Sequence, residues 1–355
     1  MDEKYLVVGQ GLAGTVLDIV LNQAGYKTFV LNQTETQSSS RVAAGIFNPV
    51  TGHRMNKTWL ADVIFPKAQA FYAGVDQMLG SSFLHPKSVF KIFNSVEQQN
   101  DVAARVADER YTDYVSQSTP LELYGSTINA PFGGATFLGG GSVDVAGLIE
   151  AYQEKLKREN RYSEVDIDYS EFQFDDDGVS WQGEKYAGLI CCEGWHASKN
   201  PFFSWLPFAL TTGEMVEVEI PNLSQEYIVN KNAFLLPLGG ERFLVGASFS
   251  RKTYLVETES MKEELLHKLE EMVTLPYKFI RCRVGIRPTV KDRRPLIGQH
   301  PKVKHLFIFN GLGTKGVTLA PHFAQQFVTE LGGGEKINSE ANINRYFSLY
   351  SEPFS

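Results

Sequence analysis

The chain has 355 residues, of which 43% are hydrophobic and 21% are charged. These values are ordinary for a globular protein, and the length is sufficient for two domains or one large α/β unit with an inserted part. The 34 Lys and Arg residues against 41 Asp and Glu residues give a net charge of −7 without a basic stripe, which argues against nucleic acid as the main partner.

The other global features argue against a membrane, disulfides and metal. No secretory pattern opens the chain, and no apolar run reaches the roughly 20 residues that span a bilayer. Cys191, Cys192 and Cys282 are too few for a disulfide framework, so a reducing cytoplasmic location is expected. The seven histidines show no metal-ligand spacing, and we expect no metal site and no membrane partner.

The N-terminal segment has the pattern of a strand, a glycine-rich turn, a helix and a second strand. An apolar run at 5–8 precedes G-x-G-x-x-G, and a helical pattern over 15–24 leads to a strand over 27–31. Glycine permits the tight turn and the close approach of a pyrophosphate to the backbone at the helix N-terminus. A dinucleotide site is therefore predicted. Its expected contacts are Gly9, Gly11, Leu12, Ala13 and Gly14.

Small residues gather in the next segment, SRVAAG. They would let a flat group approach the backbone, and the alternative is a plain surface loop. The apolar Ile46 and Phe47 beside them favour the ligand-binding interpretation. His53 follows a Thr-Gly turn and is a candidate for the pocket, with exposure to water as the alternative. The expected cofactor contacts in this segment are Ser40, Arg41, Ala43, Ala44 and Gly45.

Between residues 59 and 200 helices alternate with short strands. Helices are predicted over 59–79, 97–108 and 145–160. A strand is predicted over 87–94, and a small antiparallel meander is predicted over 165–167, 171–174 and 179–181. A buried strand at 187–192 ends at a glycine, which repeats the strand-then-glycine pattern of the N-terminus.

The last third continues the alternation of sheet and nucleotide-type segments. Strands are predicted over 210–220, 227–230, 233–236, 242–248 and 306–310, and helices over 261–273 and 317–331. A glycine-rich loop, GLGTKG, stands between the last strand and the last helix. Because the two kinds of segment alternate, the domains are predicted to be discontinuous.

Seven short pieces occur in the order and at the spacings of a known family: GQGLAG at Gly9, SRVAAG at Ser40, V-D-x-x-x-L at Val143, CCEGW at Cys191, GASFSR at Gly246, GIRP-x-x-x-D at Gly285 and GLGTKG at Gly311. Over nearly its whole length the chain resembles the FAD-dependent D-amino acid oxidase superfamily, and is most similar to its glycine oxidase branch. The resemblance implies an α/β fold of the D-amino acid oxidase type. A Rossmann-like FAD-binding domain (1–75, 139–200 and 285–355) would carry a discontinuous antiparallel-sheet substrate-binding domain (76–138 and 201–284).

The resemblance also assigns roles to single residues. Arg287, in GIRP, would hold the substrate carboxylate through its planar donors, and the alternative is an ion pair with Asp292. Lys315 would add positive charge near the flavin, or simply face solvent. The cofactor contacts expected beyond the N-terminal segments are Phe172, Gly194, Gly311, Gly313, Thr314, Lys315 and Gly316.

Three departures from the family pattern refine this expectation. Asn32 stands where an acidic residue usually binds the adenosine ribose, and its amide can still exchange two hydrogen bonds with the hydroxyls. Gly285 stands where a related branch carries the cysteine that links its flavin, so FAD is expected to be non-covalent. Leu244 replaces an oxygen-activating lysine of that branch, which leaves the electron acceptor open.

The function implied is transfer of a hydride from the Cα–H of a small carboxylate-bearing amine, of the glycine, sarcosine or D-amino acid type, to flavin N5. One alternative is an FAD-dependent oxidoreductase of 2-hydroxy acids or alcohols, and another is a non-catalytic flavin-binding redox protein. A tRNA-modifying oxidase of a related branch is disfavoured by the negative charge and by the lack of a methyltransferase domain. The sequence leaves the oligomeric state open.

Overall fold

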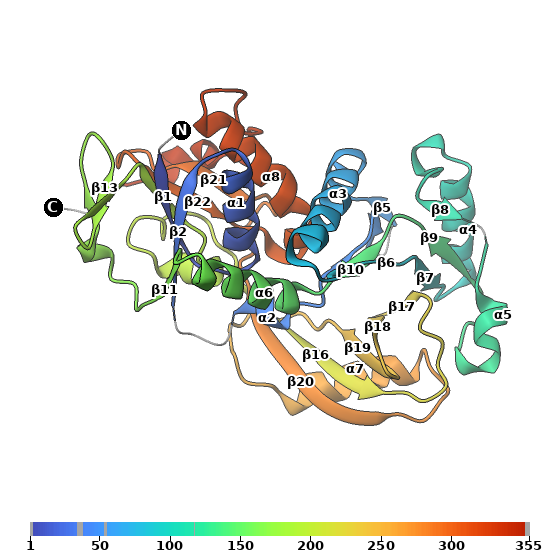
Figure 1. The fold of residues 1–355 in the computed structure, drawn as a ribbon. Helices are drawn as coiled ribbons and strands as arrows, with labels where there is room; N and C mark the ends of the chain where they lie inside the picture. The colour runs from blue at the N-terminus through green and yellow to red at the C-terminus, as the bar shows by residue number, and fades with distance from the viewer. Residues whose placement is uncertain (1–2, 34–37, 53–54, 117, 352–355) are drawn as a thin grey trace.

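A parallel sheet forms one half of the protein in the computed structural model, which describes residues 3–33, 38–52, 55–116 and 118–351 (Figure 1). Its strand order is β11-β2-β1-β15-β22-β21, and only the edge strand β21 runs antiparallel to its neighbour. The strands are β1 (Lys4–Val8), β2 (Lys27–Asn32), β11 (Tyr162–Glu164), β15 (Gly188–Cys191), β21 (Leu296–Gln299) and β22 (Leu306–Asn310).

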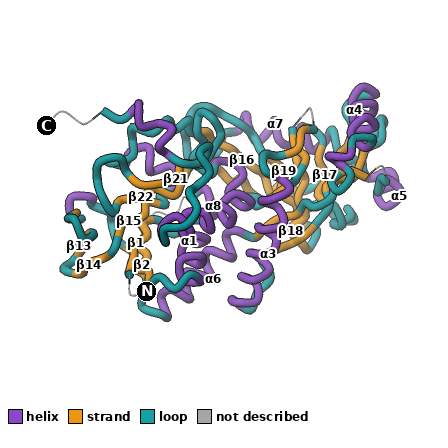
Figure 2. The backbone as a smooth tube through the Cα atoms, turned by 90° about the horizontal axis from the view of Figure 1, so that it is seen from above, coloured by secondary structure: helices purple, strands orange, loops and turns teal. Residues whose placement is uncertain are grey.

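Both faces of this sheet are buried, which explains the continuous apolar run in β1. Tyr5 and Val7 pack into a core with the helices, whereas Leu6 and Val8 pack into a second core on the opposite face. The helices of the first core lie together along one side of the sheet (Figure 2). They are α1 (Leu12–Gln23), α3 (Ala61–Leu79), α6 (Val145–Arg158) and α8 (Gly316–Leu331).

The second core is covered by a small antiparallel meander, as expected, but with different strands. Its members are β12 (Gln173–Phe174), β13 (Val179–Trp181) and β14 (Glu184–Tyr186). The strand predicted at 165–167 was wrong. The chain instead forms β11 just before it, and β11 pairs parallel to β2. Helix α6 thus leads the chain into β11, and β11 extends the parallel sheet beyond β2.

An eight-stranded sheet forms the other half of the molecule, in the order β20-β16-β19-β18-β17-β7-β9-β8. All neighbours run antiparallel except β17 and β7, which run parallel and join two distant chain segments, so the sheet is mixed. The strands are β7 (Val89–Ile92), β8 (Val115–Ser116), β9 (Gly134–Phe137), β16 (Thr211–Glu219), β17 (Ile228–Asn230), β18 (Phe234–Gly239), β19 (Arg242–Gly246) and β20 (Lys278–Arg287).

The remaining elements lie outside these two sheets. The short strands are β3 (Ile46–Phe47), β4 (Val50–Thr51), β5 (Asn56–Lys57), β6 (Leu84–Pro86) and β10 (Gly141–Val143). The remaining α-helices are α2 (Ser39–Val42), α4 (Val96–Val106), α5 (Leu121–Tyr124) and α7 (Glu259–Glu270). Helix α2 packs against β20, so the loop predicted around Ser40 is in part a helix that touches both halves of the molecule.

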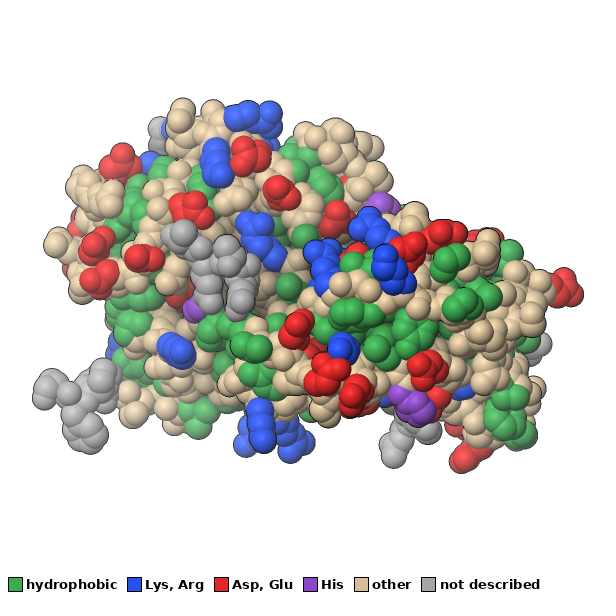
Figure 3. All heavy atoms as spheres, turned by 90° about the horizontal axis from the view of Figure 1, so that it is seen from below, with side chains coloured by type: hydrophobic (Ala, Val, Ile, Leu, Met, Phe, Trp, Pro, Cys, Tyr) green, Lys and Arg blue, Asp and Glu red, His purple; other side chains and the backbone are tan. Residues whose placement is uncertain are grey.

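The strands of the parallel sheet all fall in the segments predicted to form the FAD-binding domain. Two elements run across the predicted boundaries: α3 extends past residue 75 to Leu79, and β20 begins at Lys278 and continues past 285. The division into domains at these residues stays a prediction. Among the described residues, no helix is long and apolar enough to cross a membrane. On the face shown in Figure 3, acidic and basic side chains are interspersed.

Candidate cofactor and substrate site

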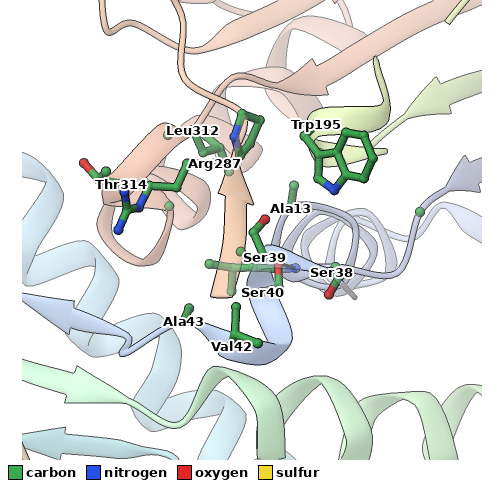
Figure 4. A pocket seen from close by; sticks show the side chains of 18 of the residues that line it. Ala13, Ser38, Ser39, Ser40, Val42, Ala43, Trp195, Arg287, Leu312 and Thr314 are labelled. Atoms are coloured by element: carbon green, nitrogen blue, oxygen red, sulfur yellow. Dashed lines mark hydrogen bonds between the residues drawn. The ribbon is translucent and has the colours of Figure 1, made fainter. Parts of the chain in front are cut away.

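A cavity of about 360 Å³ lies where the two halves meet, at the carboxyl ends of β1 and β15. Helices α1 and α2 and the start of α8 contribute walls on the side of the parallel sheet, and β16 and β20 contribute walls on the other side. Figure 4 shows side chains around the cavity, among them Ala13 of α1, Trp195 from the segment after β15, and Arg287 of β20. This is the place where open parallel sheets bind nucleotides.

The glycine loop after β1 is packed too closely for side chains. Gly9 has a φ of +98°, and a Cβ there would lie 2.6 Å from the carbonyl oxygen of Cys192. A Cβ on Gly14 would lie 1.9 Å from the Gly9 carbonyl oxygen. Gly14 therefore packs against the backbone of the glycine loop and does not line the cavity. Helix α1 begins at Leu12 without a side-chain cap from Gly11, and Leu12 and Ala13 line the cavity, so the N-terminus of this helix offers a site for an anion.

Asn32 lines the cavity, but its side-chain amide already makes hydrogen bonds to the backbone. The side-chain oxygen accepts a hydrogen bond from the Gln10 backbone N–H at 2.8 Å, and the side-chain nitrogen donates to the Gln33 carbonyl at 3.1 Å. The oxygen keeps one lone pair for a further donor. Asn32 therefore fixes the glycine loop, and only part of its hydrogen-bonding capacity remains for a ribose.

The small residues after β2 form one wall. Ser40 accepts a hydrogen bond from the Leu12 N–H at 3.1 Å, which ties α2 to the start of α1. Ala43 and Ala44 line the cavity, as does Gly45, which has a φ of +66°. Arg41 is turned away, because its guanidinium donates to the Gln153 side chain at 3.5 Å on α6.

An unpaired donor lines the cavity at the end of β15. Gly194 (φ +60°) opens a 3-10 helix, η4 (Gly194–Lys199), and the next residue is Trp195. The Trp195 indole nitrogen is buried and has no hydrogen-bond partner among the described residues, and its ring lies tilted against His196 with 3.8 Å between centroids. Buried N–H groups are nearly always paired, so this one fits an acceptor on a bound molecule. Trp195 was not predicted as a site residue, because no sequence pattern marks a donor as unpaired.

The second glycine loop contributes backbone rather than charge. Gly313, Thr314 and Gly316 line the cavity around a 3-10 turn, η5 (Gly313–Lys315). Gly311 lies outside it, against Val290 and Leu296. The Lys315 amine contacts the Thr58 hydroxyl at 3.4 Å instead of the cavity, and burial together with Arg294 and Arg293 lowers the pKa of Lys315.

Arg287, at the end of β20, supplies a partly buried cation to the cavity. Its Nη1 donates to the carbonyl oxygens of Thr212 at 3.4 Å and Ser248 at 3.5 Å. No carboxylate among the described residues pairs with Arg287, and Asp292 instead pairs with Arg345 at 3.0 Å. The alternative of an Arg287–Asp292 ion pair is thus excluded. Burial lowers the pKa of Arg287, and the apolar Met215 lines the cavity beside it.

Other predicted residues lie elsewhere. Phe172 is buried in the second core, where its ring stacks on Trp181, and it does not line the cavity. His53 lies outside the residues that the structure describes. Leu244 is fully buried in β19. In the described part of the chain no cluster of side chains could hold a metal ion.

The cavity fits FAD. A helix N-terminus and a glycine loop without room for a Cβ suit a pyrophosphate, and the unpaired indole N–H of Trp195 offers a further donor. Together these features define a dinucleotide-binding flavoprotein of the two-sheet type.

Comparison with known families agrees with this class. Residues 4–330 match the sequence model of the family described as FAD dependent oxidoreductase, named DAO. The chain therefore belongs to the DAO family of FAD-dependent oxidoreductases, as its sequence predicted, and FAD is its cofactor.

Similarity to individual relatives is low in sequence and high in fold. A glycine oxidase of Geobacillus kaustophilus is 28% identical over 111 residues, which are 30% of this chain and 29% of that protein. A tRNA 5-methylaminomethyl-2-thiouridine biosynthesis bifunctional protein of Idiomarina loihiensis is 30% identical over 143 residues, which are 38% of this chain and 23% of that protein. The matched segments thus span less than a third of either relative.

The structural similarity extends over the whole chain. The crystal structure of glycine oxidase from Geobacillus kaustophilus matches with a TM-score of 0.78 and 20% identity, over 95% of this chain and 97% of that one. An iminodiacetate oxidase from a Chelativorans species matches with a TM-score of 0.76 and 18% identity, over 96% and 98% of the chains. The predicted fold is confirmed.

Proposed function

We propose that this protein oxidises a small amine that bears a carboxylate, of the glycine, sarcosine or D-amino acid type. The observation that carries the proposal is Arg287, a partly buried guanidinium at the cavity without an acidic partner among the described residues. The bound flavin supplies a hydride acceptor at N5 for the hydrogen that leaves the substrate Cα. The names of the relatives, glycine oxidase and iminodiacetate oxidase, support a substrate of this size and charge.

The residues around the cavity bind and orient the substrate. Arg287 offers planar, parallel N–H donors, which fit the two oxygens of a carboxylate. Met215 and Phe234 give the neighbouring wall an apolar surface that excludes water from the reacting carbon. With the carboxylate held at one end, the Cα–H bond takes one orientation, and fixed orientation is a large part of catalysis in flavoenzymes.

Anaerobic mixing of the holoenzyme with matched pairs of amines tests this function. Glycine and sarcosine should bleach the flavin absorbance, whereas methylamine and dimethylamine, which lack the carboxylate, should not. Bleaching by lactate or glycolate alone would instead establish a 2-hydroxy acid oxidoreductase. Flavin that no donor reduces would contradict the proposal and favour the non-catalytic redox protein.

A second candidate substrate is an N-substituted glycine carried on a larger molecule. The 30% match over 143 residues to a tRNA-modification protein favours it. Bleaching by carboxymethylaminomethyl-uridine at lower concentration than by glycine would select this candidate.

We also propose that FAD is held without a covalent bond. Position 285 is glycine, and it packs against Val42 of α2. Heating or acid should therefore release all of the flavin into the supernatant as FAD, and yellow colour that stays with the precipitated protein would contradict this.

A further inference from the structure

Glu214 is a buried carboxylate one residue away from two positions that line the cavity. It lies in β16 between Gly213 and Met215, and it is only 1% exposed. Its carboxylate has three hydrogen-bond donors, all from the segment 248–258 that follows β19. The Tyr254 hydroxyl donates to Oε1 at 3.0 Å, the Thr258 hydroxyl to Oε1 at 2.8 Å, and the Thr258 N–H to Oε2 at 3.0 Å.

The same segment contacts β16 through its backbone. Thr212 and Ser250 exchange two hydrogen bonds of 2.9 Å, and the Ser248 N–H donates to the Glu214 carbonyl at 2.9 Å. The Glu214 N–H donates in turn to the Ser248 hydroxyl at 2.9 Å. Ser248 is therefore held by the backbone of Glu214 through its N–H and its hydroxyl, although the segment has no helix and, beyond the bridge at Ser250, no strand pairing.

The fixed segment in turn contacts Arg287. The carbonyl of Ser248 and the carbonyl of Thr212 both accept hydrogen bonds from the Arg287 guanidinium. Both acceptors are neutral, so they orient the guanidinium without neutralising its charge. One acceptor belongs to a regular strand. The other belongs to the segment that Glu214 contacts through its backbone at Ser248 and through its carboxylate at Tyr254 and Thr258.

We propose that Glu214 is a positioning residue for carboxylate binding: it holds segment 248–258 against β16 and so keeps the Ser248 carbonyl on Arg287. This inference rests on the proposed function, because it assumes that Arg287 receives a carboxylate. Buried carboxylates that accept several hydrogen bonds stabilise the chain segment that supplies the donors. Glu214 acts through Arg287 and does not touch the substrate.

The test compares Glu214→Gln with Glu217→Gln. Gln at 214 places an NH2 group against the Thr258 N–H or against the two hydroxyls, so at least one donor loses its acceptor. Glu217 is the matched control: it lies in the same strand, is also 1% exposed, and is held by Arg281 and Arg283 instead of the segment.

Binding of acetate to the holoenzyme, followed by the perturbation of the flavin absorbance, is the first readout. Glu214→Gln should raise the Kd for acetate about five- to tenfold, with an equal rise in KM for the amine, while kcat changes less than about threefold. Glu217→Gln should leave the Kd for acetate unchanged, and both variants should keep the FAD affinity of the native protein. Tyr254→Phe should raise the Kd less, and its effect should not add to that of Glu214→Gln because the two share a bond.

Hydrogen exchange in the same samples is the second readout. Exchange should accelerate across 248–258 in Glu214→Gln and stay unchanged there in Glu217→Gln. Native affinity for acetate in Glu214→Gln would overturn the inference and leave the proposed function standing, whether or not the segment exchanges faster. An equal loss of affinity for acetate in Glu214→Gln and Glu217→Gln would do the same. If the native protein neither binds acetate nor oxidises carboxylate-bearing amines, the proposed function fails, and the inference fails with it even if exchange reports a loosened segment.

Discussion

The charge of Arg287 is the residue-level property on which the substrate class depends. A guanidinium paired with a carboxylate of the same chain would have little attraction left for a ligand, and here the acceptors are two carbonyl groups. The neighbouring Asp292, which could have neutralised it, is held by Arg345 and by the Arg294 N–H. The cation is therefore partly buried, and no carboxylate of the described residues neutralises it.

Substitution of Arg287 should separate substrate binding from cofactor binding. Truncation of a buried charge partner costs about 2–5 kcal/mol, so Arg287→Ala should raise the KM for a carboxylate-bearing amine by about 100-fold or more. Arg287→Lys keeps the charge but loses the planar pair of donors, so its KM should lie between those of the native protein and Arg287→Ala. Steady-state kinetics and the flavin content check this. A KM within threefold of the native value in Arg287→Ala would contradict it.

The unpaired indole N–H of Trp195 should contribute to FAD affinity. In Trp195→Phe the ring remains and the donor is lost, so the Kd for FAD should rise about five- to tenfold. Trp205→Phe is the control, because the Trp205 nitrogen donates to the Phe202 carbonyl at 2.7 Å, outside the cavity. Titration of apoprotein with FAD, followed by flavin fluorescence, measures both. Equal affinities in the two variants would mean that Trp195 does not bind the cofactor.

At the scale of elements, the packing of β16, β20 and α2 determines how the two halves of the cavity meet. Gly213 of β16 and Gly285 of β20 are direct partners in the antiparallel register. A Cβ on Gly213 would lie 1.7 Å from Arg287 Nη2, and a Cβ on Gly285 would lie 2.6 Å from Val42 Cγ2 and 3.4 Å from Ser39 Cα. Glycine at both positions lets the strand pair approach the arginine on one side and α2 on the other.

Alanine at these two glycines should therefore weaken the binding of two different ligands. Gly213→Ala displaces the end of the flexible Arg287 side chain, so the Kd for acetate should rise about tenfold with little change in FAD affinity. Gly285→Ala pushes α2, a wall of the cofactor cavity, so FAD affinity should fall by a similar factor. Titrations with acetate and with FAD distinguish the two. The same pattern of losses in both variants would show that the strand pair responds as one unit.

The elements also show which features the sequence could predict. Strands buried on both faces, such as β1 and β15, and helices with one apolar stripe, such as α6, appeared near their predicted positions because burial leaves a periodic pattern. Strand β20 was not predicted: its first half is an exposed sheet edge that carries Lys278 and Arg281, so no apolar alternation marks it. The glycine loops and Arg287 were recognisable as motifs. The contacts of Asn32, Lys315 and Trp195 could not be predicted, because they depend on how distant parts of the chain pack around these side chains.

At the scale of the whole molecule, two buried histidines make stability depend on pH. Burial lowers the pKa of His300 to about 4, and burial together with Lys67 lowers that of His322 to about 4. The His300 Nδ1 accepts the Val303 N–H at 3.0 Å, which requires an unprotonated nitrogen. Between pH 6.5 and 4 the unfolded chain binds protons that the folded chain does not. The free energy of unfolding should therefore fall as the pH falls through this range.

Each histidine should contribute a slope of about 1.4 kcal/mol per pH unit. Urea unfolding of the apoprotein at several pH values measures the slope. His300→Asn keeps an acceptor near the Val303 N–H without a titrating ring, and its unfolding free energy should fall less steeply below pH 6.5. An unchanged slope in this variant would show that His300 is not responsible.

Strand β20 also bears on which carbon of a substrate can react. The strand that ends at Arg287 packs against α2 through Gly285, two residues earlier, so the proposed carboxylate anchor and the contact with the wall formed by α2 lie on one strand. The carbon that meets the flavin is then selected by its number of bonds from the carboxylate. In β-alanine the amine-bearing carbon lies one bond of about 1.5 Å further away, and a misplacement of about 1 Å can cost 100-fold in rate. Glycine should therefore reduce the flavin at least 100-fold faster than β-alanine in stopped-flow measurements, and this chain should discriminate among amines by the length of the carbon chain between the carboxylate and the amine.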